Sequence, residues 1–137
     1  MAKNGYNTGL AAEFFVLSIL HRKGVDANLT LGNKKSVDIA AVLRAGEAIT
    51  IDVKGLAGRT GWPVDNIRKP KANHFIVFVC FRGKIDDATV VPEVWVVPSR
   101  RIPALTYHSP SGKRRLVSRS TLNARGARYR DAWHLIT

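Results

Sequence analysis

The chain has 137 residues, of which 45% are hydrophobic and 23% are charged, with 22 Lys and Arg against 10 Asp and Glu. This length suits one domain with an apolar core, and the apolar content is too high for a disordered chain. No stretch reaches the roughly 18 apolar residues of a membrane span, and no signal-peptide pattern is visible. The single cysteine, Cys80, excludes a disulfide framework and a cysteine-rich zinc site. We therefore expect one cytoplasmic domain over residues 1–137.

The basic excess indicates an anionic partner. The net charge is +12, and nucleic acid is the usual polyanion for such a protein. Residues 99–137 hold nine basic residues and one acid, whereas residues 1–98 hold 13 basic residues and nine acids. We expect DNA as the partner, with RNA as the alternative, and a basic C-terminal part over residues 99–137.

The first half of the chain predicts one helix followed by strands. Leu10, Phe14 and Leu17 recur at helical spacing, and Val16 and Leu20 widen this apolar stripe. Gly24 stands where a helix commonly ends, so a helix is expected over residues 8–23. Glu13 lies at the edge of this apolar stripe or inside it. Runs rich in Val and Ile predict strands over residues 36–43 and 47–54, with a weaker candidate over 27–31.

The second half predicts a long loop, two strands and short elements. Residues 55–72 contain three Gly and two Pro, which indicates a loop, and loops of that length are commonly functional. Residues 74–81 are almost continuously apolar, as in a strand buried on both faces, and residues 94–97 predict another strand. Short helices are expected at 99–104 and 120–134, and a basic loop or hairpin at 108–115. This order predicts an α/β or α+β domain around a mixed sheet.

Two aspartates fall opposite each other in the hairpin predicted around Gly46. A three-residue loop with Gly46 in the left-handed conformation is a common hairpin connection, and it pairs Asp38 with Asp52. In this register the large aliphatic residues share one face, and Asp38, Asp52 and Lys54 share the other. The Cβ atoms of opposed residues lie about 4.5–5.5 Å apart, so the two carboxylates repel unless a cation lies between them.

A divalent cation would relieve this repulsion. Mg²⁺ is typically held by one or two carboxylates and a substrate phosphate, and Lys54 adds a fixed positive charge. Such a site can orient a water, lower its pKa and neutralise charge on a scissile phosphate. The alternative is an ordinary solvated strand face with a cross-strand ion pair. The second aspartate in register, the apolar neighbours and Glu13 on the preceding helix favour the metal site.

These residues resemble the motif of the PD-(D/E)XK nuclease superfamily. Glu13 on the helix, Asp38 on one strand and Asp52-Val53-Lys54 on the next carry the resemblance, which covers roughly residues 5–81. Gly9, four residues before Glu13, is similar to the opening of archaeal Holliday junction resolvases. Val37 stands where the motif has Pro, and the form is D-x-K rather than E-x-K.

The resemblance implies a restriction-endonuclease-like α/β core, with a mixed sheet of four to five strands flanked by helices. It also implies Mg²⁺- or Mn²⁺-dependent hydrolysis of a phosphodiester. Asp38, Asp52 and the Val53 carbonyl would bind the metal. Lys54 would act on the attacking water or the phosphate, and Glu13 would assist the metal directly or through water.

Basic residues of the long loop and the C-terminal part are expected to contact backbone phosphates. For Trp62, in the same loop, two interpretations remain: a contact with DNA or a place in the core. The four histidines lack metal-ligand spacing, so they are expected at surfaces or interfaces. The predicted phosphate contacts are Arg59, Arg68, Lys69, Lys71, Lys113, Arg114 and Arg115.

The sequence therefore predicts a Mg-dependent DNA endonuclease. The resemblance to junction resolvases makes a homodimer the expected assembly, because cutting two strands takes two sites. One alternative is a restriction or repair nuclease of the same fold. The other is a nucleic-acid-binding module without activity, in which Asp38 and Asp52 are structural.

Overall fold

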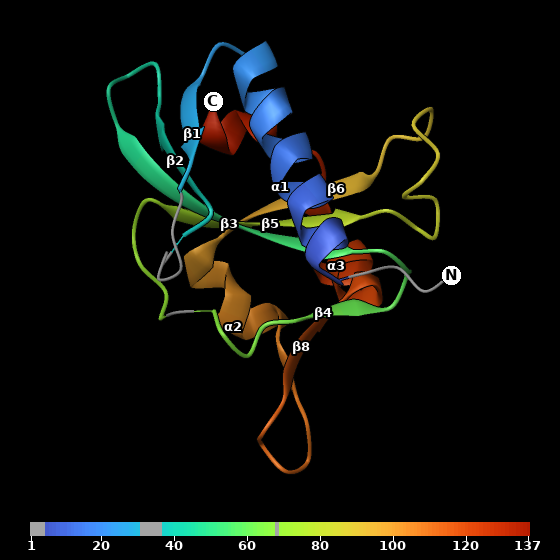
Figure 1. The fold of residues 1–137 in the computed structure, drawn as a ribbon. Coiled ribbons are helices and arrows are strands. Elements are labelled where there is room, and N and C mark those ends of the chain that lie inside the picture. The colour runs from blue at the N-terminus through green and yellow to red at the C-terminus, as the bar shows by residue number, and fades with distance from the viewer. Residues whose placement is uncertain (1–4, 31–36, 68) are drawn as a thin grey trace.

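A computed structural model describes residues 5–30, 37–67 and 69–137 (Figure 1). A five-stranded sheet forms the centre, and its strands run in the order β1-β2-β3-β5-β6. The neighbours pair antiparallel except β3 and β5, which pair parallel. This mixed five-stranded sheet with flanking helices confirms the predicted α/β fold class. The strands are β1 (Asp26–Leu29), β2 (Ile39–Val42), β3 (Ala48–Leu56), β5 (His74–Cys80) and β6 (Glu93–Pro98).

The long helix α1 (Gly5–Arg22) covers one face of this sheet (Figure 1). Its buried stripe repeats every four residues through Thr8, Ala12, Val16 and Leu20. The expected stripe was right at Val16 and Leu20 but wrong at Phe14, which is 54% exposed. The buried stripe begins with two small side chains, so the first turns of the helix can lie close to the sheet. No described helix is long and apolar enough to cross a membrane.

Glycine at position 55 permits that close approach. A Cβ atom on Gly55 would lie 2.9 Å from the Thr8 carbonyl oxygen and 3.0 Å from the Ala12 Cβ. Both distances are shorter than ordinary van der Waals contacts, so any side chain here would push α1 away from β3. Gly55 directly follows Lys54, and the close approach therefore brings α1 to the end of β3 that carries the candidate site.

A second, three-stranded sheet has the order β4-β8-β7 and packs on the other face. It consists of β4 (Gly61–Pro63), β7 (Tyr107–His108) and β8 (Arg115–Ser118). The expectation of a structureless loop over residues 55–72 was therefore wrong at β4. The pairing of β4 with β8 joins segments more than 50 residues apart, and no local pattern reports such a contact. The β7–β8 pair confirms the basic hairpin predicted at 108–115.

The remaining helices are short. Two of them, the 3₁₀ turn η1 (Ser99–Arg101) and α2 (Ile102–Leu105), confirm the helix expected at 99–104. The helix expected at 120–134 is instead divided into α3 (Arg119–Arg125) and two 3₁₀ turns, η2 (Ala127–Tyr129) and η3 (Trp133–Ile136). The chain leaves helical geometry at Gly126, and Asp131 takes a positive φ of 51°.

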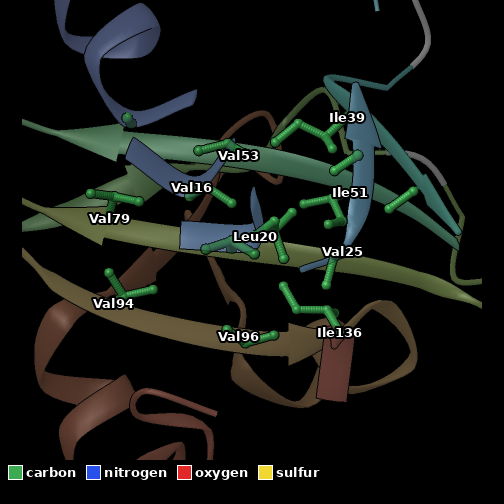
Figure 2. Packing of buried hydrophobic residues seen from close by; sticks show 14 of the residues in the cluster. Val16, Leu20, Val25, Ile39, Ile51, Val53, Val79, Val94, Val96 and Ile136 are labelled. Atoms are coloured by element: carbon green, nitrogen blue, oxygen red, sulfur yellow. The ribbon is translucent and has the colours of Figure 1, made fainter. Parts of the chain in front are cut away.

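The sheet is buried on both faces. Figure 2 shows the first core, in which Val16 and Leu20 of α1 lie beside Ile51 and Val53 of β3. The second core, on the opposite face, contains Trp62, Phe78 and Trp95, whose rings meet edge to face at centroid distances of 5.0 and 6.0 Å. Strand β5 contributes to both cores, which confirms the predicted central strand.

Candidate functional site

The hairpin between β2 and β3 has the predicted register. Ile39 pairs with Ile51, and the Leu43 N–H donates to the Glu47 carbonyl at 2.8 Å. Gly46 has a φ of +89°, the left-handed value that a three-residue loop requires at this position. The alternation is also as predicted, because Ile39, Ile51 and their neighbours on that face are buried.

The paired register ends at Ile39 and Ile51, one residue before the predicted pair of Asp38 with Asp52. The Asp38 N–H donates to the Ile51 carbonyl at 3.0 Å, and Asp38 Oδ2 accepts from the Val53 N–H at 2.8 Å. The Asp38 carboxylate is therefore fixed beside the Asp52–Val53 peptide. In a strand, the N–H and carbonyl of one residue point to the same neighbouring strand, so the Val53 carbonyl also faces the side of Asp38.

Asp52 and Lys54 are half-buried on β3, on the face opposite α1. The Asp52 side chain is 16% exposed. Lys54 Nζ donates to Asn66 Oδ1 at 2.8 Å, so the segment after β4 orients the lysine. Asn66 was not predicted from the sequence, since its contact depends on how the 64–67 turn folds against β3.

His74 holds the Asp52 carboxylate. The ring is 3% exposed, and its Nε2 lies 3.2 Å from Asp52 Oδ2 while its Nδ1 lies 2.7 Å from Thr50 Oγ1. A carboxylate only accepts, so Nε2 donates to Asp52; in the neutral ring Nδ1 then accepts from the Thr50 hydroxyl. The expectation of a surface or interface position was wrong for His74. The parallel register, in which Thr50 faces His74, brings the two residues together, and local sequence does not report that pairing.

Glu13 is half-buried on α1, next to Ala12, whose side chain meets the position of a Gly55 Cβ. Glu13 therefore belongs to the turn of α1 that crosses the Lys54–Gly55 end of β3. Within residues 5–30, 37–67 and 69–137, no three His, Cys, Asp or Glu side chains form a group that could hold a metal ion. Among the described residues, Glu13 therefore does not form a three-carboxylate group with Asp38 and Asp52. Its action on a metal through water stays a prediction.

Two carboxylates and a backbone carbonyl fit Mg²⁺ or Mn²⁺. These are hard oxygen donors, and Mg²⁺ usually binds through one or two carboxylates while waters and substrate phosphate complete its shell. The hydrogen bonds from the Val53 N–H and His74 each orient one carboxylate. Asp38, Asp52 and the Val53 carbonyl therefore remain the donor set that the resemblance implies.

The predicted phosphate-binding residues are spread over two segments. On the chain before and after β4, Arg59, Lys69 and Lys71 are exposed. Arg68 lies outside the described residues. Trp62 is only 1% exposed, and its Nε1 donates to the Val79 carbonyl at 3.3 Å, so it belongs to the core.

The other predicted contacts lie on the β7–β8 hairpin, which extends away from the sheets in Figure 1. Lys113 and Arg114 are exposed, and Arg115 is half-buried. Asp65 fixes the base of this hairpin: it accepts from the Arg115 N–H at 2.6 Å and from Arg114 Nε at 3.1 Å. The hydrogen bond from the Arg115 N–H lowers the pKa of Asp65, so this carboxylate stays ionised.

No protein-family model matches the chain, and no curated protein matches its sequence. Among solved structures, the fold is similar to that of a bacterial homing endonuclease, I-Ssp6803I. The TM-score is 0.61 at 18% sequence identity, and the match covers 98% of this chain and 93% of that chain. At this identity the likeness concerns the fold, and it extends over the central sheet and the elements on both of its faces. The chain therefore shares the α/β fold of this structure.

Proposed function

We propose that the protein is a divalent-metal-dependent DNA endonuclease. The observation that carries the proposal is the pair of carboxylates at the end of the β2–β3 ladder, Asp38 bound to the Val53 N–H and Asp52 bound to His74. Two fixed carboxylates beside Lys54, in a protein of net charge +12, suit a site that holds a metal against a phosphate. The fold shared with an endonuclease supports the same reaction class.

Each residue of the site has a defined task in this proposal. Asp38, Asp52 and the Val53 carbonyl hold Mg²⁺ or Mn²⁺, which when bound neutralises charge on the scissile phosphate and acidifies a water. Lys54, oriented by Asn66, donates from Nζ to a phosphate oxygen or to the attacking water. His74 positions Asp52 without touching the substrate.

The substrate class follows from charge and from the resemblance to junction resolvases. The basic loop and hairpin residues contact phosphates and supply affinity that depends on salt but carries little sequence information. We propose that branched DNA is cut, and that two copies of the chain act together, since one chain supplies one site. RNA is the alternative substrate.

Cleavage of plasmid, linear duplex and four-way-junction DNA tests the proposal. Each substrate is incubated with wild-type protein in Mg²⁺, Mn²⁺ or EDTA, and with the Asp52→Asn variant. The matched control is Asp26→Asn, the same change on an exposed residue of β1. We expect metal-dependent cutting by wild type and Asp26→Asn, and at least a hundredfold slower cutting by Asp52→Asn. DNA binding in EDTA without cutting of any substrate would instead identify a binding module.

A further inference from the structure

A cavity of about 350 Å³ lies beside the candidate site and is not part of it. It is open to solvent on one side and is lined by the segment after β4, by η1 and α2, and by the β7–β8 hairpin. Its walls are largely apolar and include Val64, Ile67, Pro70, Ile102 and Pro103. This volume is within the range of small-ligand sites, which are commonly apolar with a few polar groups at the edge.

The turn at residues 64–67 separates the cavity from the site. Val64 and Ile67 line the cavity, and the Ile67 N–H donates to the Val64 carbonyl, which closes the turn. Asn66, between them, points the other way and accepts from Lys54 Nζ. The cavity is therefore one turn of chain away from the lysine proposed to contact the scissile phosphate.

The polar part of the lining contains two cations and an imidazole, and its two hydroxyls are already hydrogen-bonded. Lys69, His108 and Arg115 line the cavity, and none of its lining residues is acidic. Ser99 Oγ accepts from the Lys71 N–H at 2.9 Å and donates to the Lys71 carbonyl at 3.1 Å. Thr106 Oγ1 donates to the Ile102 carbonyl at 2.6 Å. The cavity thus offers apolar walls and the positive charges of Lys69 and Arg115, while both lining hydroxyls are already bonded.

We propose that this cavity binds one unpaired nucleobase of the DNA strand. The inference rests on the proposed function and deepens it by naming a feature of the substrate. A nucleotide combines a flat, largely apolar base with an anionic phosphate, and the cavity combines apolar walls with Lys69 and Arg115. Enzymes that capture extruded bases place them in such pockets between apolar side chains. The cavity therefore selects an unpaired base rather than duplex DNA.

Binding to short labelled duplexes in EDTA tests the cavity separately from cleavage. One duplex is blunt, one carries a three-nucleotide single-stranded overhang, and one carries the same overhang with abasic sites. The Pro103→Phe variant fills the cavity from an exposed position of α2. Its matched control is Ala104→Phe, at the adjacent exposed residue of the same helix, which does not line the cavity.

We expect wild type and Ala104→Phe to bind the overhang about five-fold or more tightly than the blunt duplex. The Pro103→Phe variant should lose this preference while keeping its affinity for blunt DNA. The abasic overhang should bind like blunt DNA, since it keeps the phosphates and lacks the bases. Equal affinity of wild type for all three duplexes would overturn the proposal.

An overhang preference that Pro103→Phe retains would also overturn it. If that variant also changes the molecular mass in sedimentation, the cavity holds a side chain of a second copy instead. Failure of the nuclease proposal gives a different result, namely no cleavage by any variant whatever the overhang preference.

Discussion

His74 Nε2 lies 3.2 Å from Asp52 Oδ2, and this contact joins the hairpin strand β3 to the central strand β5. The histidine is almost fully buried, so water has little access to its hydrogen bond with the Asp52 carboxylate. Thr50 completes the chain at the other ring nitrogen. The orientation of Asp52 is therefore set by two residues outside the motif, one on its own strand and one on the neighbouring strand.

Replacing Thr50 by Val tests this chain of hydrogen bonds. The change keeps the shape of the side chain but removes the donor to Nδ1 of a buried ring, so the free energy of unfolding should fall by about 1–3 kcal/mol. The control is Thr60→Val, the same change at an exposed residue, which should alter stability by at most about 0.5 kcal/mol. Urea unfolding measures both. Equal stability of Thr50→Val and wild type would mean that the hydroxyl does not bond the ring.

Gly55 is predicted to be intolerant of a side chain. In Gly55→Ala the new Cβ would lie 2.9 Å from the Thr8 carbonyl oxygen, and backbone cannot move away cheaply, so the expected destabilisation is about 1–3 kcal/mol. Gly58→Ala is the control, because a Cβ on Gly58 meets nothing within 4 Å. The melting temperatures of the two variants should differ by several degrees. If both variants melt together, the packing of α1 on β3 is looser than described.

The sequence predicted the hairpin register because the information is local. Gly46 specifies the turn, and the alternation of aliphatic residues on each side specifies which residues face the core. Counting from that register places Asp38 and Asp52 just beyond the last observed pair, Ile39 with Ile51. The buried strand at residues 74–81 was also visible, since a run that is apolar at every position indicates burial on both faces.

His74 and β4 could not be predicted in this way. The position of His74 beside Asp52 depends on the parallel pairing of β3 with β5, which is a property of the sheet order. Strand β4 lies in a Gly- and Pro-rich segment and forms only because β8 supplies its partner. The helix face was misjudged at Phe14, because the small residues Thr8 and Ala12, rather than the largest side chains, face the sheet.

Stability should depend on pH through Glu93. Hydrogen bonds from Arg119 to both of its carboxylate oxygens, at 2.7 and 3.0 Å, lower the pKa of Glu93 from its ordinary value near 4.5. The unfolded chain then binds the proton more readily, so stability rises with pH in this window. The contribution is complete above about pH 5 and is lost as the pH falls through the lowered pKa.

The Glu93→Gln variant isolates this effect. At pH 7 it should lose about 1–3 kcal/mol of unfolding free energy relative to wild type, because a charged hydrogen-bond acceptor becomes neutral. The difference should shrink as the pH falls through the lowered pKa of Glu93, because Glu93 of wild type then also becomes neutral. Glu47→Gln, at an exposed turn residue, serves as the control and should follow wild type. A difference that stays constant from pH 7 to 3 would contradict the assignment.

The β7–β8 hairpin is predicted to contact DNA phosphates through Lys113. Lys113→Gln should weaken binding in EDTA by a similar factor for unrelated sequences and reduce the slope of log K against log salt by about 1, the loss expected for one phosphate contact. Lys84→Gln removes the same charge from the exposed loop between β5 and β6, away from the hairpin, and controls for net charge. Its slope should stay close to that of wild type. Equal slopes for the two variants would mean that only the overall charge matters, whereas a smaller slope for Lys113→Gln alone would assign a phosphate to the hairpin.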